Sequence, residues 1–135
     1  MPLMRVLVDT SVWIDYFRSG EKSQALDYLL DAEEVVVNDL ILTELVPFLR
    51  LRKQSAVIKL LNKLPKRPLV IDWQEIREFQ FLCLKAGING IGIPDLLIAQ
   101  NARQSECLVF SLDKHFEKMR DVIELKMYDA DILLE

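Results

Sequence analysis

The sequence predicts an α/β fold with a central, mainly parallel sheet, and two features of the chain carry that prediction. Several short runs are rich in Val, Leu and Ile and lack the polar alternation of half-exposed strands, which suits parallel strands covered on both faces. Helical patterns lie between these runs, and strands that alternate with helices are typical of parallel α/β sheets. With 135 residues and no repeat or linker, the chain is expected to form a single domain over 1–135.

The predicted sheet has four to five strands. Four runs are short and mostly apolar, and a fifth is weaker because charged residues interrupt it. The strands are predicted at Arg5–Val8, Val35–Val37, Leu69–Ile71 and Leu108–Phe110, with Glu124–Tyr128 as the weaker candidate. Apolar residues at helical spacing fill most of the remaining chain. The helices are predicted at Ser11–Arg18, Lys22–Ala32, Asp39–Leu51, Ser55–Leu64, Trp73–Ala86 and Pro94–Gln104.

Composition narrows the class of protein. Apolar residues make up 51% of the chain, enough for a core that needs no disulfide, so Cys83 and Cys107 are expected as reduced thiols of a cytoplasmic protein. No apolar run approaches the roughly 20 residues of a membrane-spanning helix, and the N-terminus has no signal-peptide pattern. His115 is the only histidine, which excludes chemistry that relies on a pair of histidines.

Two acidic residues follow predicted strands. Asp9 comes directly after the first strand, and Ser111 and Asp113 follow Leu108–Phe110. In a parallel α/β sheet, ligands bind beyond the carboxyl ends of the strands. The two aspartates are therefore expected at one edge of the sheet. The alternative is that each one only caps the helix that follows it.

Two further acidic residues lie on the apolar faces of predicted helices. At 100° per residue, Glu44 falls within the stripe that Ile41 and Leu45 form. Asp95 shares its helix face with Ile98. A carboxylate on a buried face costs several kcal/mol unless a partner offsets that cost. The alternatives are that Glu44 reaches the edge of its helix or pairs with an arginine, and that Asp95 stabilises the helix dipole.

Converging carboxylates need a cation. Two of them about 4 Å apart repel by roughly 4 kcal/mol at an effective dielectric of 20. All-oxygen ligand sets suit Mg²⁺ or Mn²⁺, and such an ion can activate water and stabilise the charge that develops on a phosphate. The sequence therefore predicts a catalytic metal site made by Asp9, Glu44, Asp95 and Asp113.

Four short motifs resemble those of the PIN-domain ribonucleases, especially the toxins of VapBC toxin–antitoxin pairs. They occur in the expected order and span nearly the whole chain. The motifs are Val-Leu-Val-Asp9-Thr-Ser-Val-Trp-Ile, Leu42-Thr-Glu44-Leu, Ile93-Pro-Asp95-Leu-Leu-Ile-Ala99 and Val109-Phe-Ser111-Leu-Asp113-Lys-His-Phe116. His115 stands where many members carry another acid, so a fifth carboxylate is not expected.

The resemblance implies a three-layer α/β/α fold, divalent-metal-dependent cleavage of RNA, and inhibition by a cognate antitoxin. Asp9, Asp95 and Asp113 would hold Mg²⁺ or Mn²⁺ directly or through water. Glu44 would complete the cluster or orient the attacking water. Hydroxyl groups would hold ligands or waters in place around the metal. The residues that supply them would be Thr10 or Ser11, together with Ser111.

Positive charge is concentrated in one part of a chain whose net charge is −4. The segment Leu45–Ile71 holds seven basic residues, and all 21 acidic residues lie outside it. An RNA strand that approaches an acidic site needs cations near its phosphates, so this segment is the candidate RNA guide. The alternative is a solvated helix face. The candidate RNA contacts are Arg50, Arg52, Lys53, Lys59 and Lys63.

The helices between Asp39 and Leu64 carry more apolar residues than one buried face requires, and surplus apolar surface is typical of interfaces. The residues concerned are Leu40, Leu42, Leu49, Leu51 and Ile58. We therefore expect a homodimer and an antitoxin segment near the same helices. The alternative is that they pack only within the domain.

Two other functions remain open. One is a PIN-like module that binds RNA or a partner without cleaving. The other is a phosphatase-like α/β enzyme that uses Asp9. Phosphatases of the haloacid-dehalogenase type place a second aspartate two residues after the first. In this chain Ser11 occupies that position, which argues against the phosphatase.

Overall fold

Three short parallel strands form the centre of the protein in the computed structural model, which describes residues 4–130. Strand β1 (Val6–Val8) lies between β2 (Val35–Val36) and β3 (Leu108–Phe110). Both neighbours run parallel to β1, with Val6 opposite Val35 on one side and opposite Leu108 on the other. The predicted parallel α/β sheet is therefore confirmed. The strand farthest along the chain pairs with the first one.

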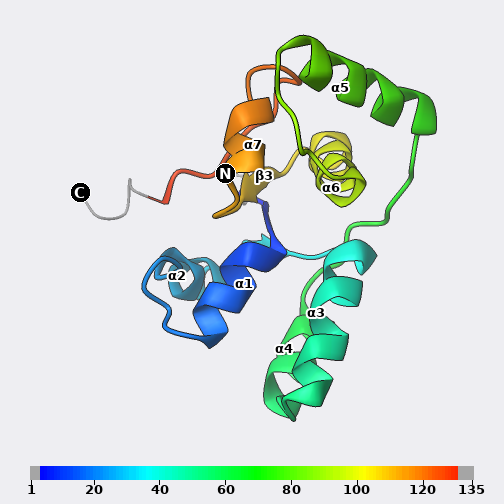
Figure 1. The fold of residues 1–135 in the computed structure, drawn as a ribbon. Helices are drawn as coiled ribbons and strands as arrows, with labels where there is room; N and C mark the ends of the chain where they lie inside the picture. The colour runs from blue at the N-terminus through cyan, green and yellow to red at the C-terminus, as the bar shows by residue number, and fades with distance from the viewer. Residues whose placement is uncertain (1–3, 131–135) are drawn as a thin grey trace.

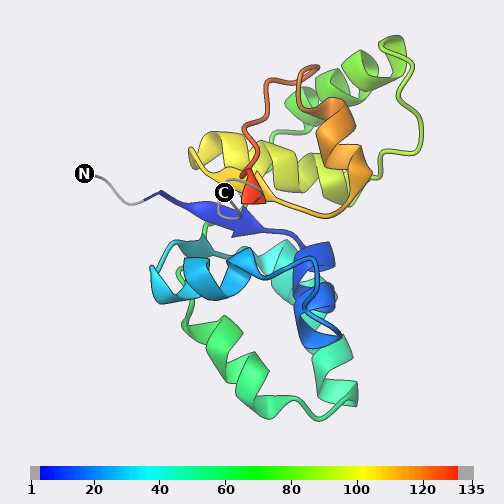
Figure 2. The same cartoon turned by 90° about the vertical axis from the view of Figure 1, so that its left-hand side faces the viewer.

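Helices cover both faces of this sheet. In Figure 2, α1 to α4 lie on one side of the strands and α5 to α7 on the other, which gives three layers. Figure 1 shows α3 and α4 as a pair that projects away from the sheet. The helices are α1 (Thr10–Phe17), α2 (Ala25–Asp31), α3 (Asp39–Leu51), α4 (Ser55–Lys63), α5 (Trp73–Lys85), α6 (Ile93–Gln104) and α7 (Lys114–Met119).

The core forms where the strands meet the apolar helix faces. The side chains of β1 are fully buried, and Trp13 and Leu45 pack against them with no exposed surface. Cys83 and Cys107 are buried and unpaired, as predicted. Within residues 4–130, no helix is both long and apolar enough to cross a membrane.

A buried pair of asparagines joins the two helical layers. Asn38 caps α3 by accepting a hydrogen bond from the backbone N–H of Ile41 (2.9 Å), and its Nδ2 donates to Asn101 Oδ1 (2.9 Å). Asn101 in turn donates to the carbonyl of Pro68 (2.9 Å). Both asparagines are buried and their amides are partnered, so their burial carries little penalty. Helix α3, which carries Glu44, is thereby fixed against α6, which carries Asp95.

The predicted strand Leu69–Ile71 is wrong. Val70 is 67% exposed, and the segment has no strand pairing. Side chains of α6 bind the backbone here instead: Gln104 donates to the carbonyl of Val70 (2.9 Å), and Gln100 bonds both backbone groups of Asp72, the residue after the segment. Pro68 also lacks the N–H that a central strand would donate. On this side the sheet ends in a single bridge between Val37 and Lys66.

The weaker candidate Glu124–Tyr128 makes one bridge and no strand. Met127 lies opposite Val109 in a parallel bridge, and the N–H of Tyr128 donates to the carbonyl of Val109 (2.8 Å). Residues 4–130 therefore hold three strands rather than four or five. The prediction also lacked a helix at Lys114–Met119. The ends of the predicted domain, 1–3 and 131–135, lie outside the described residues.

Candidate metal centre

Two strands deliver polar side chains to the same edge of the sheet. Asp9 directly follows β1, and its N–H donates to the carbonyl of Phe110 in β3 (2.9 Å). Ser111 directly follows β3. Since β1 and β3 are parallel neighbours, their carboxyl ends meet, and the side chains of Asp9 and Ser111 lie together. This edge is where α/β sheets bind ligands.

Asp9 is held by two serine hydroxyls, an arrangement that we call the serine clasp. Ser11 Oγ (2.8 Å) and Ser111 Oγ (2.9 Å) both donate to Asp9 Oδ2. Each hydroxyl has a single proton, so the 3.3 Å contact between the two serines carries no hydrogen bond while both protons point to Asp9. As acceptors, Ser11 Oγ takes the N–H of Leu112 (3.0 Å), and Ser111 Oγ takes the N–H of Asp113 (2.9 Å).

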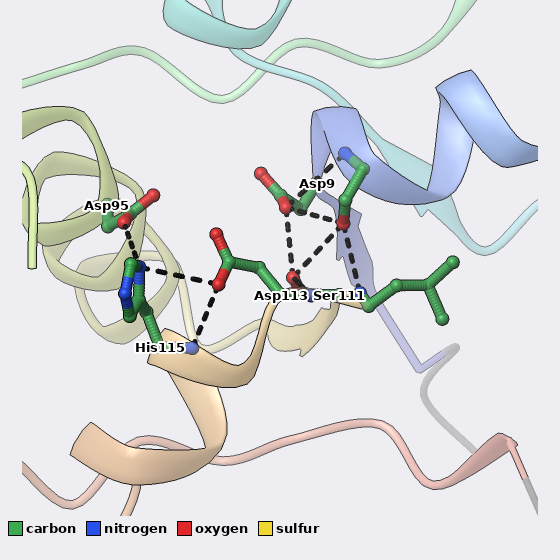
Figure 3. A network of polar contacts seen from close by, with 7 residues as sticks. Asp9, Asp95, Ser111, Asp113 and His115 are labelled. Carbon is green, nitrogen blue, oxygen red and sulfur yellow. Dashed lines mark hydrogen bonds and ion pairs between the residues drawn. The ribbon is translucent and has the colours of Figure 1, made fainter.

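The clasp fixes one side of a carboxylate that is only 6% exposed. Its donors all contact Oδ2, including the backbone N–H of Ser11 (3.4 Å). Figure 3 shows the second oxygen of Asp9 directed toward the space between Asp95 and Asp113. The predicted supporting role of Ser11 and Ser111 thus has a geometric basis, with both hydroxyls orienting Asp9.

Asp95 and Asp113 approach the same space from two other elements. Asp95 directly follows Pro94 in the first turn of α6, and its side chain is 20% exposed. Asp113 caps α7, with its Oδ1 accepting the N–H of His115 (2.9 Å). Asp9 likewise caps α1. The alternative interpretation of Asp9 and Asp113 as helix caps is therefore correct, and it is compatible with a shared site because each carboxylate has a second oxygen.

Glu44 faces the cluster from α3, but it is less buried than its helix face predicted. The residue is exposed, and Thr10 Oγ1 donates to its Oε1 (2.9 Å). The apolar stripe of α3 buries Ile41 and Leu45, and Glu44 lies where that stripe meets solvent beside α1. Thr10 therefore positions Glu44, and Ser11 positions Asp9, so the two hydroxyls at the start of α1 serve different carboxylates.

The electrostatics of the cluster follow from burial and from like charges. Burial raises the pKa of Asp95, and the charges of Asp113 and Asp9 raise it further, while His115 acts in the opposite direction. Burial also raises the pKa of Glu44; the Thr10 hydrogen bond opposes this, and the charges of Asp9 and Asp95 add to it. The charged forms of Asp95 and Glu44 are thus disfavoured by burial and by the neighbouring carboxylates.

His115 completes the arrangement, and the sequence interpretation missed it. Its Nδ1 lies 3.4 Å from Asp95 Oδ2 and 3.4 Å from Asp113 Oδ1. One atom from each of these three residues falls within 4.8 Å of the others. The signal was present in the sequence, since His115 lies two positions after Asp113 and the helix cap turns its ring back toward the cluster.

These residues fit a divalent cation. Carboxylate oxygens dominate the donor set, and burial and the neighbouring charges raise the pKa of Asp95. The Nδ1 atom of His115 is buried without a hydrogen bond, 3.4 Å from both Asp95 Oδ2 and Asp113 Oδ1. Hard divalent ions favour such oxygen-rich sites, and manganese also accepts imidazole nitrogen. The carboxylate oxygens and the Nδ1 atom of His115 are therefore suited to hold a metal ion.

The predicted RNA contacts all lie on the α3–α4 hairpin and all are exposed. The guanidinium of Arg52 stacks over the ring of Phe48 at 4.9 Å. The surplus apolar residues of this hairpin differ in burial: Leu49 is buried and Leu51 is 86% exposed. The other three are partly buried and pack against the core, namely Leu40, Leu42 and Ile58. The interface interpretation is therefore wrong for Leu49, which belongs to the core.

The fold is shared with solved structures of toxin–antitoxin systems. A chain of VapBC2 from Rickettsia felis, bound to promoter DNA, is 17% identical with a TM-score of 0.71, and the match covers 93% of this chain and 98% of that one. A chain of DNA-bound VapBC from Salmonella typhimurium is 14% identical with a TM-score of 0.71, and the match covers 94% of this chain and 98% of that one. VapC20 from Mycobacterium tuberculosis, a toxin that cleaves the sarcin–ricin loop, is 16% identical with a TM-score of 0.58. The match covers 83% of this chain and 92% of that one.

The sequence itself carries a family signature. No curated protein sequence matches the chain. The sequence model of the PIN domain, however, matches residues 6–122, a range that includes β1, β3 and every residue of the carboxylate cluster. The chain therefore belongs to the PIN-domain family.

Proposed function

We propose that this protein is a metal-dependent endoribonuclease of the VapC toxin type. The observation that carries the proposal is the convergence of Asp9, Glu44, Asp95 and Asp113 at one edge of the sheet, from four separate elements. A fold gains no stability from gathering like charges in a half-buried space, so the arrangement is best explained by a bound cation and its chemistry.

In this proposal Asp9, Asp95 and Asp113 hold Mg²⁺ or Mn²⁺. When bound, the ion supplies a water of lowered pKa and offsets charge on the phosphate. Glu44 lies at the solvent side of the cluster, where its carboxylate can accept a proton from the attacking water. The serine clasp keeps Asp9 in one rotamer, and Thr10 does the same for Glu44, so the carboxylates are aligned before substrate binds.

The proposed substrate is RNA, and the proposed partner is an antitoxin. The fold resembles VapBC complexes and a toxin that cleaves the sarcin–ricin loop. We propose that the protein acts in the cytoplasm as a single domain, that it forms a homodimer, and that an antitoxin segment covers a groove beside α3 and α4. The exposed side chain of Leu51 supplies apolar surface there.

We further propose that the basic side chains of the α3–α4 hairpin guide the RNA backbone. Lys59 and Lys63 are exposed on α4. The same hairpin carries Glu44 on α3, so a strand bound along these lysines leads toward the carboxylate cluster. Lys66 is less available, because it forms an ion pair with Asp39 at 3.0 Å.

The test is cleavage of ribosomal and transfer RNA by tag-free protein with Mn²⁺, with Mg²⁺ or with EDTA. Metal-dependent cleavage is expected, with 5′-phosphate ends. A water nucleophile does not use the ribose 2′-hydroxyl, so a 2′-O-methyl group at the cleaved position should not abolish the reaction. Cleavage that persists in EDTA, or that yields 2′,3′-cyclic phosphate, would contradict the proposal. Asp113→Asn should be inactive, and Asp31→Asn, on the exposed end of α2, should match wild type.

The same experiment separates the two other functions. A binding module would retain RNA without cutting it in any metal. A phosphatase would release phosphate from a small phosphomonoester and leave internal RNA bonds intact. Ser11 disfavours the phosphatase, because it stands where phosphatases of the haloacid-dehalogenase type carry their second aspartate.

A further inference from the structure

The imidazole of His115 presents to the carboxylate cluster a nitrogen that makes no hydrogen bond. That nitrogen is Nδ1, which is buried. The two nearest polar atoms are Asp95 Oδ2 and Asp113 Oδ1, each 3.4 Å away, and neither contact has hydrogen-bond geometry. A buried polar atom without a partner is uncommon and requires an explanation. A metal ion bound by this nitrogen would explain why it makes no hydrogen bond.

The start of α7 and the loop before α6 lie on either side of the ring. On the backbone side, the N–H of His115 donates to Asp113 Oδ1 (2.9 Å), which fixes the start of α7. On the other side, the loop before α6 passes the Nε2 atom, and a Cβ built on Gly90 would lie 3.8 Å from it. Gly90 has φ +82°, a conformation that favours glycine. The loop therefore keeps a bare backbone beside Nε2, and Nδ1 faces the carboxylates.

We propose that His115 Nδ1 is a metal ligand beside Asp95 and Asp113, and that it makes the site prefer Mn²⁺ to Mg²⁺. The inference deepens the proposed function, because it rests on the same metal site. The three donor atoms lie within 4.8 Å of one another. Adjacent ligands of an octahedral ion with bonds of about 2.1 Å are about 3.0 Å apart, so small side-chain adjustments bring all three donors to one ion.

The preference follows from the nitrogen. Magnesium is a hard ion that retains water and oxygen ligands, whereas imidazole suits the later first-row metals. Manganese accepts both donor types. A nitrogen in the ligand set therefore adds affinity for Mn²⁺ and little for Mg²⁺. In the binding form the ring is neutral, with its proton on Nε2 and the lone pair on Nδ1.

The decisive measurement is pulsed electron paramagnetic resonance of Mn²⁺ bound to tag-free, full-length protein. A coordinated imidazole adds ¹⁴N modulation to the spin echo. His115 is the only histidine in the chain, so that signal has a single source. We expect ¹⁴N modulation in wild type and in the control Glu117→Gln, an exposed position of α7. We expect none in His115→Asp, which offers oxygen in place of nitrogen.

A second measurement tests the preference. Calorimetric titrations with Mn²⁺ and with Mg²⁺ give the ratio of the two affinities for each variant. The ratio should fall by at least about tenfold in His115→Asp and remain unchanged in Glu117→Gln. Melting curves of the metal-free proteins show whether each variant folds. If His115→Asp does not fold, the wild-type spectrum decides alone.

Each outcome is informative. Bound Mn²⁺ without ¹⁴N modulation overturns the role of His115, even if RNA is still cleaved, and so does an unchanged affinity ratio. Modulation from a protein that cleaves no RNA supports the ligand and contradicts the nuclease. Wild type that binds no Mn²⁺ at millimolar concentration overturns the ligand and the metal site together.

Discussion

The carboxyl edge of the sheet and the α3–α4 hairpin carry opposite charges and are built in opposite ways. At the edge, side chains distant in sequence bond to one another: Ser111 and Asp9 are 102 positions apart, and Thr10 and Glu44 are 34 apart. In the hairpin, the basic residues are neighbours along two helices. They point into solvent, and Leu61 is the one residue of α4 that is fully buried.

This difference determines how each region responds to substitution. A carboxylate in the cluster has fixed partners, so replacing one residue alters the geometry and charge of the whole site. A lysine on the hairpin acts through charge alone, which solvent and salt weaken. We therefore expect large, position-specific effects at the edge of the sheet and small, additive effects on the hairpin.

Asp95→Asn should lower the rate of metal-dependent RNA cleavage by at least about 100-fold, more than the loss of a residue that only supports a ligand. Asparagine keeps the shape of the side chain and removes the charge that holds the ion. The measurement is kcat with saturating Mn²⁺. Glu78→Gln, which removes one exposed negative charge from α5, is the control and should retain wild-type activity. A rate in Asp95→Asn within threefold of wild type would remove Asp95 from the site.

Ser111→Ala should weaken Mn²⁺ binding by about 10- to 100-fold. The substitution removes one donor to Asp9 Oδ2 and the acceptor for the N–H of Asp113, so both carboxylates lose a fixed orientation. Calorimetric titration gives the affinity directly. Ser55→Ala, at the exposed start of α4, should bind as wild type does. Equal affinities for the two variants would show that the serine clasp does not orient the metal ligands.

Glu44→Gln should stabilise the metal-free protein near neutral pH. The pKa of Glu44 is raised above its ordinary value of 4.5, so the folded state binds this proton more tightly than the unfolded state does. The resulting stabilisation is complete below about pH 4.5 and is lost as the pH rises through the raised pKa. At pH 7 the folded protein therefore carries an unfavourable charge, which Gln removes while its Oε1 still accepts from Thr10.

The expected gain in Tm at pH 7 in EDTA is up to a few degrees, since about 1 kcal/mol shifts the Tm of a domain this size by roughly 4 °C. The advantage over wild type should shrink between pH 7 and pH 4. Glu78→Gln should show neither effect. A Tm difference that stays constant with pH would mean that the charge of Glu44 is not the cause.

The double variant Lys59→Glu/Lys63→Glu should weaken RNA binding for all sequences alike, with Ca²⁺ in place of Mn²⁺ to suppress cleavage. Each lost contact to single-stranded RNA lowers the slope of log affinity against log salt by roughly 0.7. The Mn²⁺ affinity should not change. The control Lys85→Glu/Lys126→Glu makes the same charge change elsewhere. If the salt slope of the double variant equals that of wild type, the lysines do not contact RNA. The hairpin would then be a solvated surface or a docking site for an acidic partner.

The fold was predictable where local pattern and burial agree. Strands β1 and β3 are apolar runs in the sequence, and both lie in the core. The run at Leu69–Ile71 has the same pattern and is not a strand. Gln104 binds the carbonyl of Val70, and Gln100 binds both backbone groups of Asp72 beside the run. Those amides lie 28 and 34 positions away in sequence. The residue types at Leu69–Ile71 therefore could not reveal that these distant amides bind the backbone here.

The candidate site divides in the same way. Helix periodicity and strand ends located all four acidic residues, since those signals are local. The burial of Glu44 was overestimated, because periodicity indicates a helix face and not how far a neighbouring helix covers it. The Nδ1 atom of His115 in α7 lies 3.4 Å from Asp95 of α6, and only the folded chain brings these two helices together.

The serine clasp also determines when during synthesis the carboxylate cluster can form. The ribosome adds Ser11 100 positions before Ser111, so Asp9 and Ser11 leave the exit tunnel well before Ser111 and Asp113 do. Until β3 pairs with β1, Asp9 lacks one of its two hydroxyl donors. A nascent or prematurely terminated chain therefore holds at most part of the carboxylate cluster. The site is assembled only when the last strand docks, so its formation reports that the sheet is complete.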